Sequence, residues 1–249
     1  MKYIIDYALC CNRGKLRRKN QDNFFCRGEF LPVENDGFEW IKSGKITSDG
    51  KNVLAVFDGM GGEQMGEYAS YIAASALKEL TAVGTDRSLE EYCLEINRRI
   101  CTFAEENGIR SMGTTGCLIN FAEKEVNICN IGDSKIYHFD GSTMLQLSVD
   151  HAIKTGSGKA PLTQFLGVPE EEFIIQPHSA TAEYRKGDIY LICSDGLTDM
   201  VEHESIQSVL TSGKSMEECV EALLTMALDG GGRDNITILL CCVKRRKLF

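Results

Sequence analysis

Four aspartates stand at the edges of apolar runs, where a strand would deliver a side chain to the end of a sheet. The runs and their aspartates are 53–57 with Asp58, 129–132 with Asp133, 191–194 with Asp195, and 235–239 with Asp234. A carboxylate in such a place is costly to desolvate unless a partner shares its charge. Divalent cations such as Mg²⁺ take oxygen ligands and keep water beside one or two carboxylates. The strand ends therefore predict a site for one or two ions, while each aspartate alone would also fit a helix cap or a turn.

Two further features strengthen this interpretation. Gly59 directly follows Asp58, and a glycine lets the backbone approach closely, so its carbonyl could also serve as a ligand. Arg17 lies in 14–22, the densest basic stretch before the C-terminal tail. Its planar guanidinium can hold a phosphate with two parallel hydrogen bonds. A solvated turn is the alternative for this stretch.

Composition sets the frame for these residues. Of 249 residues, 43% are hydrophobic and 25% charged, which excludes a disordered or fibrous chain. No stretch is typical of a linker, so we expect one domain over 1–249. The net charge of −9 argues against a broad basic face for nucleic acid. No run approaches the roughly 18 apolar residues of a membrane helix, so we expect neither nucleic acid nor membrane as a partner.

The eleven cysteines sit mostly inside apolar runs, and no two have the Cys-x-x-Cys spacing of a zinc or redox site. They are expected to be small buried hydrophobic residues in a reducing compartment. The first residues lack the long apolar core of a secretory signal. We therefore expect a cytoplasmic protein.

Hydrophobic periodicity predicts strands alternating with pairs of helices. Strands are expected at 2–10, 22–26, 52–57, 113–121, 125–131, 135–139, 173–176, 188–193 and 235–243. Helices are expected at 65–80, 89–104, 203–210 and 216–228. The region 28–51 would form a hairpin or loop, and 150–159 a loop. Many strands with paired helices between them indicate α+β layering, not a regular βαβ fold.

Seven short motifs follow one another in an order typical of a single enzyme family. They are Arg17 with Asn20-Gln21-Asp22, then 57–62, Gly113-Thr114-Thr115, 131–134, Asp150-His151, 193–197 and 232–235. Each motif alone is weak, but seven in order are specific. From about Tyr7 to Val243 the sequence resembles the metal-dependent serine/threonine protein phosphatases of the PPM, or type 2C, family in their compact bacterial form.

The resemblance implies a four-layer αββα sandwich, in which two mostly antiparallel sheets are flanked by helix pairs and the metals lie at one end. It implies the cofactors, two Mn²⁺ or Mg²⁺ ions and a third, weaker ion. The implied roles are metal bridging by Asp58, first-metal ligation by Asp195 and Asp234, second-metal ligation by the Gly59 carbonyl, third-ion binding by Asp133 with Asp195, phosphate binding by Arg17, and holding of metal-bound water by Asp22.

The implied reaction is hydrolysis of phosphoserine or phosphothreonine by a water that the two ions activate, without a covalent intermediate. The partners would be phosphorylated proteins, among them targets of a serine/threonine kinase. A catalytically inactive phosphatase-fold module that binds a partner is the alternative, and survival of Asp58, Asp195 and Asp234 argues against it. A phosphatase dedicated to one regulatory protein would differ in partner, not in chemistry.

Three positions depart from the family pattern. Gln21 stands where many members carry an acidic residue, so it can hydrogen-bond a water but supplies no charge, which predicts weak affinity for the second ion. Met60 stands where animal members often carry a histidine, and methionine cannot donate a proton. The stretch after Asp150-His151 is shorter than the usual helical flap, contains Lys154 and Lys159, and predicts an open, mobile groove with weak sequence preference.

Overall fold

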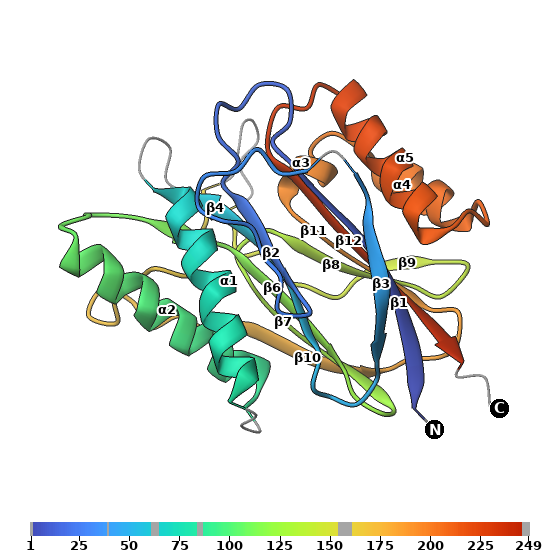
Figure 1. Ribbon diagram of the computed structural model, residues 1–249, viewed down its shortest axis with the longest axis horizontal. Coiled ribbons are helices and arrows are strands. Elements are labelled where there is room, and N and C mark those ends of the chain that lie inside the picture. Colours follow the sequence, from blue (N-terminus) through green and yellow to red (C-terminus); the bar gives the residue numbers. More distant parts are fainter. Residues whose placement is uncertain (1, 39, 61–64, 84–86, 154–160, 246–249) are drawn as a thin grey trace.

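The computed structural model describes residues 2–38, 40–60, 65–83, 87–153 and 161–245. Within these ranges the strand pairs are antiparallel and form two sheets. The helices lie outside them in two groups (Figure 1). The predicted four-layer αββα sandwich is therefore confirmed.

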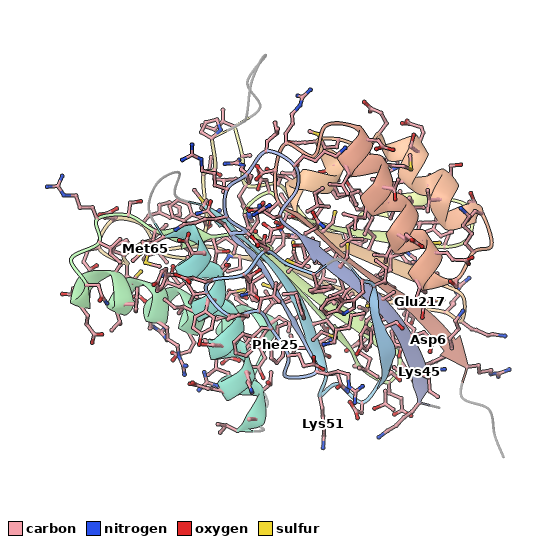
Figure 2. The ribbon with its side chains drawn as sticks, turned by 45° about the horizontal axis from the view of Figure 1, so that its top comes forward. Asp6, Phe25, Lys45, Lys51, Met65 and Glu217 are labelled. Atoms are coloured by element: carbon pink, nitrogen blue, oxygen red, sulfur yellow. The ribbon has the colours of Figure 1, made fainter. Side chains whose placement is uncertain are left out.

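Sheet A contains the strands nearest to the two ends of the chain. Its order is β3-β1-β12-β11-β8-β9. The bounds are β1 Tyr3–Asn12, β3 Lys42–Thr47, β8 Lys135–Phe139, β9 Met144–Gln146, β11 Ile189–Cys193 and β12 Ile236–Arg245. β1 and β12 pair along their whole lengths, from Tyr3 opposite Arg245 to Asn12 opposite Ile236. At the outer edge, Asp6 of β1 forms an ion pair with Lys45 of β3 (Figure 2).

Sheet B has the order β10-β7-β6-β4-β2, and the short β5 also pairs with β4. The bounds are β2 Asp22–Cys26, β4 Val53–Met60, β5 Gly113–Thr114, β6 Gly116–Phe121, β7 Glu125–Ile131 and β10 His178–Glu183. The middle strands are buried over most of their length, which explains why 53–57 is a continuous apolar run.

Each sheet has helices on its outer face. α1 (Gly66–Ala82) and α2 (Leu89–Glu106) cover sheet B, and α4 (His203–Thr211) and α5 (Met216–Asp229) cover sheet A, with the short α3 (Asp195–Thr198) at its end (Figure 1). Capping boxes, Ser88 with Glu91 and Ser215 with Glu218, satisfy the first backbone N–H groups of α2 and α5. None of the helices within the described ranges has the length and apolar character that crossing a membrane requires.

Apolar side chains fill two cores. One lies between the sheets and continues under α4 and α5, and the other lies between sheet B and the pair α1 and α2. Phe25 of β2 belongs to the second core (Figure 2). Ten of the eleven cysteines are buried and all are free thiols, as expected of small hydrophobic residues.

Three sequence predictions need correction. The segment 173–176 is not a strand, because Phe173 and Ile174 are 46% and 70% exposed and the strand lies further on, at β10. β10 escaped prediction because it is a polar edge strand with alternating exposure. In 28–51 the regular element is β3, which pairs with β1 and not within a hairpin of its own. β9 and α3 were not predicted, since each is only three or four residues long.

Candidate active site

The strand register brings all the predicted site residues to one end of the sandwich. In sheet B, Asp22 at the start of β2 lies opposite Asp58 near the end of β4. In sheet A, Cys193 at the end of β11 lies opposite both Lys135 and Ile238. Hydrogen bonds from Ser194 and Thr237 to Asp22 join this end of sheet A to that end of sheet B. The segments next to these strand ends carry Arg17, Asp133, Asp195 and Asp234.

Asp22 is the most deeply buried of these carboxylates, with 1% of its surface exposed. Its Oδ2 accepts hydrogen bonds from the hydroxyls of Ser194 and Thr237, both at 2.7 Å. Its buried Oδ1 has no hydrogen-bond partner among the described residues. Burial, together with the charges of Asp195 and Asp234, raises the pKa of Asp22 to about 7, although the hydroxyl hydrogen bonds lower it. A cation at this point would relieve that cost.

Asp58 is held through its backbone. Its N–H donates to Thr115 Oγ1 at 3.1 Å, and its carbonyl accepts from the Thr115 N–H at 2.9 Å. Thr115 Oγ1 also lies 2.7 Å from Ser134 Oγ, next to Asp133 in sequence. Thr115 thus ties the strand of Asp58 to the turn of Asp133, a role that its motif alone did not reveal.

Gly59 stands where two backbone segments meet. Its N–H donates to the carbonyl of Gln21 at 3.1 Å. A Cβ on Gly59 would lie 2.2 Å from the Gly66 carbonyl oxygen and 2.4 Å from that of Gln21. Only glycine fits there, which keeps the start of α1 close to β2 and β4. Met65, in the left-handed region at φ 70°, precedes this first turn (Figure 2).

Arg17 pairs with Asp234, its Nη2 lying 2.6 Å from Oδ2, while its side chain remains 44% exposed. This hydrogen bond raises the pKa of Arg17 further above its ordinary value, and the charges of Asp234, Asp58 and Asp195 act in the same direction. The guanidinium therefore lies within electrostatic reach of three of the predicted metal ligands.

Asn235 anchors the loop that carries Arg17. Its Oδ1 accepts from the N–H of Gln21, and its Nδ2 donates to the carbonyls of Arg13 and Lys19. Gly14, at φ 77°, packs so closely that a Cβ would lie 2.2 Å from the Asp234 carbonyl. The sequence contained Asn235 within a motif, but its bonds to residues more than two hundred positions away were not predictable.

Asp195 and Asp133 approach from sheet A. Asp195 is 4% exposed and begins α3. Asp133 lies in the β7–β8 turn, where Lys135 Nζ donates to the Asp133 carbonyl and to Asp150 Oδ2. His151 holds this turn through two hydrogen bonds to Gly132. The Gly132 N–H donates to His151 Nδ1, and the His151 N–H donates to the Gly132 carbonyl.

Two predicted features fall partly outside the described residues. They are the glycines at 61–62 and most of the flap, 154–160, with Lys154 and Lys159, so the expectation of an open groove stays a prediction. The described base of that segment is a narrow antiparallel pairing, in which Ile153 N–H donates to the Pro161 carbonyl and Thr163 N–H to the His151 carbonyl.

The donor set fits a divalent cation. Across the described ranges no three acidic, histidine or cysteine side chains are grouped closely enough to form a ready-made metal site. Yet burial, helped by the charges of Asp195 and Asp234, raises the pKa of Asp22, and its Oδ1 lacks a donor among the described residues. Oxygen-only donors of this kind suit Mg²⁺ or Mn²⁺. Cys193, whose pKa burial raises to about 12, stays a thiol and suits neither ligation nor attack.

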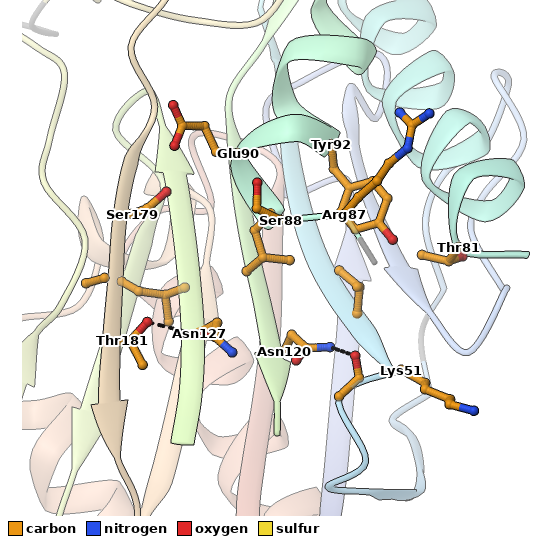
Figure 3. A pocket seen from close by; sticks show the side chains of 15 residues that line it. Lys51, Thr81, Arg87, Ser88, Glu90, Tyr92, Asn120, Asn127, Ser179 and Thr181 are labelled. Atoms are coloured by element: carbon orange, nitrogen blue, oxygen red, sulfur yellow. Dashed lines mark hydrogen bonds between the residues drawn. The ribbon is translucent and has the colours of Figure 1, made fainter. Parts of the chain in front are cut away.

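A cavity of about 500 Å³ is lined by none of these carboxylates, and Figure 3 shows the side chains that line it. It is lined by Lys51 before β4, by Asn120 near the end of β6 and by Asn127 near the start of β7. Those positions mark the opposite end of sheet B from Asp58. The carboxylate cluster, not this cavity, is the candidate active site.

Comparisons with known proteins agree with this geometry. Residues 38–229 match the family model for protein phosphatase 2C. Serine/threonine phosphatase stp of Listeria welshimeri is 33% identical, over 92% of this chain and 92% of that protein. Protein phosphatase PhpP of Streptococcus pneumoniae is 31% identical, over 78% of this chain and 87% of that protein.

Solved structures give the same answer. The crystal structure of the Mycobacterium tuberculosis serine/threonine phosphatase PstP/Ppp has a TM-score of 0.77 at 27% identity, covering 97% of this chain and all of that one. The PstP catalytic domain in complex with two manganese ions has a TM-score of 0.75, covering 97% and 99%. Fold and matches together define a metal-dependent phosphatase. The chain belongs to the protein phosphatase 2C family and is a serine/threonine protein phosphatase.

Proposed function

We propose that the carboxylates at this end of the sandwich bind two Mn²⁺ or Mg²⁺ ions and that the enzyme hydrolyses phosphoserine and phosphothreonine in proteins. One observation carries the proposal: four carboxylates converge at one end of the sandwich, and the Arg17 guanidinium lies beside them. The carboxylates are those of Asp22, Asp58, Asp195 and Asp234. We assign Asp58 as the bridging ligand, Asp195 and Asp234 to the first ion, and the Gly59 carbonyl to the second. Asp133 with Asp195 would hold a third, weaker ion.

When bound, the ions supply Lewis acidity and lower the pKa of the water that attacks phosphorus. Arg17 binds the substrate phosphate, since its guanidinium is half exposed and lies at the carboxylate cluster. Asp22 keeps Oδ1 as an acceptor toward the water in the site, because Ser194 and Thr237 occupy only Oδ2.

The reaction adds one water to the phosphate ester. A P–O bond to water forms, the P–O bond to the serine or threonine oxygen breaks, and that oxygen takes up a proton. Met60 cannot supply this proton. The products are the free hydroxyl side chain and inorganic phosphate.

The substrates we propose are phosphoproteins, including targets of a serine/threonine kinase, and the place of action is the cytoplasm. Eleven free thiols, ten of them buried, support a reducing compartment. We also propose that 1–249 forms a single catalytic domain with its core at about 7–243, because β1 and β12 are neighbours at the centre of sheet A.

Hydrolysis of a phosphothreonine peptide, with and without Mn²⁺, tests the function. We expect phosphate release that depends on added Mn²⁺ and is lost in Asp58→Asn. The alternative, a catalytically inactive binding module, predicts no release at any Mn²⁺ concentration while phosphopeptide binding persists.

A further inference from the structure

Glu67 is a buried carboxylate beside the proposed metal site, and nothing in the sequence analysis singled it out. It lies in the first turn of α1, and its side chain is 5% exposed. Its Oε2 accepts a hydrogen bond from Gln21 Nε2 at 3.0 Å, and its Oε1 accepts one from Lys19 Nζ. Lys19 itself is 71% exposed, so the network links the protein surface to Gln21.

The neighbouring backbone keeps this network next to Asp58 and Gly59. Gln21 is fixed on both sides, since its N–H donates to Asn235 Oδ1 and its carbonyl accepts from the Gly59 N–H. Gly66, which precedes Glu67, packs against Gly59 so tightly that a Cβ on Gly59 would meet the Gly66 carbonyl at 2.2 Å. Glu67 and Gln21 are therefore held at the position where the Gly59 carbonyl is proposed to bind the second ion.

The chemistry of the side chains gives Gln21 one orientation. A primary amide has a donor end and an acceptor end, whereas an ionised carboxylate only accepts. Burial alone would raise the pKa of Glu67, but the hydrogen bonds from Lys19 and Gln21 bring it below its ordinary value. Glu67 is thus ionised at neutral pH and turns the Nε2 end of Gln21 toward itself. The carbonyl end, Oε1, is left as an acceptor.

We propose that Glu67 is a positioning residue for the second metal ion. It fixes the amide of Gln21 so that Oε1 remains available to water in the shell of that ion. This inference rests on the proposed function, because it requires the second ion to bind beside Gly59. Lys19 keeps Glu67 charged and oriented.

Mn²⁺ binding to the substrate-free protein, measured by titration calorimetry, tests this role. We compare wild type, Glu67→Gln, Gln21→Ala and the double variant. Loss of an orienting partner typically weakens metal affinity by about tenfold or more. We expect each single variant to lose this much Mn²⁺ affinity at the site of the second ion. The double variant should lose no more, since both residues act through the amide of Gln21.

A charge exchange separates positioning from structural support. In Gln21→Glu/Glu67→Gln the carboxylate stands at 21 and accepts from the amide at 67, so Mn²⁺ affinity should return to within about threefold of wild type or exceed it. Gln21→Glu alone places two carboxylates about 3 Å apart and should bind less well than the exchanged pair. Glu79→Gln is the matched control. Glu79 lies on α1, as Glu67 does, but it is exposed and pairs with Arg99 of α2, so this variant should bind Mn²⁺ as wild type does.

Two outcomes would overturn the proposal. One is Mn²⁺ affinity within about twofold of wild type in Glu67→Gln with a native circular dichroism spectrum. The other is a loss in Glu67→Gln that Gln21→Ala does not share. If Glu67→Gln does not fold, Glu67→Asp, which keeps the charge but withdraws it from Gln21, should show the same weakening. Asp58→Asn tests the metal site itself, so Mn²⁺ binding that survives in Asp58→Asn would refute the proposed function separately.

Discussion

Asp22 and Asp58 lie directly opposite each other on the antiparallel strands β2 and β4. Opposed acidic residues on neighbouring strands destabilise a sheet unless something separates or neutralises their charges. Here the Asp22 carboxylate is held by Ser194 and Thr237 on one oxygen and stays without a donor on the other. The protein thus keeps an electrostatic cost in its sheet that a divalent cation would remove.

Asp58→Asn should abolish activity while preserving the fold. Removing the charge of the proposed bridging ligand should reduce turnover of a phosphothreonine peptide by about a hundredfold or more, because metal terms contribute several kcal/mol. In metal-free buffer the melting temperature should stay equal or rise, since repulsion among the carboxylates falls. Turnover above about a tenth of wild type would contradict the bridging role.

Arg17→Ala should mainly raise KM for a phosphopeptide. In the wild type, Arg17 would contact the phosphate in both the ground state and the transition state. Such a contact stabilises both states equally, so its loss weakens substrate binding more than it slows turnover. Steady-state kinetics of the wild type and of Arg17→Ala give the two KM values to compare. Arg13→Ala is the matched control, because Arg13 lies in the same loop but pairs with exposed Asp36. Equal KM values for the two variants would remove Arg17 from the substrate site.

Gly59→Ala should damage both stability and activity. The added Cβ would meet two carbonyl oxygens at 2.2 and 2.4 Å, so β2, β4 or α1 must shift, at a cost of about 1–3 kcal/mol. Gly28→Ala is the comparison, since a Cβ there meets nothing within 4 Å and carries only the strain of φ 78°. Urea unfolding and peptide hydrolysis of both variants give the result. Wild-type activity in Gly59→Ala would contradict this prediction, because it would show that the site still works when α1 lies further from β4.

Stability should fall in mildly acidic solution because of His151. Burial lowers the pKa of His151, with His178 acting in the same direction and Asp150 in the opposite one. As pH falls below about 6.5, the unfolded chain takes up a proton that the folded ring resists, so stability present above that pH is lost. Protonation of Nδ1 would also break the bond from the Gly132 N–H.

Melting temperatures measured from pH 8 to pH 5 check this expectation. His151→Gln should lose less on acidification than wild type, while His203→Gln, at an exposed position on α4, should follow wild type. Parallel curves for all three proteins would mean that His151 does not contribute to the acid sensitivity.

Sequence reasoning found the four aspartates because each directly follows or precedes a strand that is apolar on both faces. Such a strand is a continuous apolar run, which can be recognised in the sequence alone. It found Arg17 through the basic stretch 14–22 and Asp22 through a motif. It missed Glu67, Asn235 and Thr115, whose roles depend on which distant segment packs beside them. Propensity placed a strand at 173–176 because three apolar residues stand together there, although Phe173 and Ile174 are exposed and only Ile175 is buried.

The pairing of β1 with β12 has a consequence for how the enzyme is made. Arg17 follows β1, whereas Asp234 and Thr237 belong to the segment that ends in β12, so the site joins residues synthesised early with residues synthesised late. While the last strand is still inside the ribosome, Arg17 has no Asp234 and Asp22 has no Thr237. Contacts of such long sequence separation form late in folding. A chain truncated before β12 would therefore lack Thr237 and the strand that holds Asp234 in place, and we expect it to show no phosphatase activity.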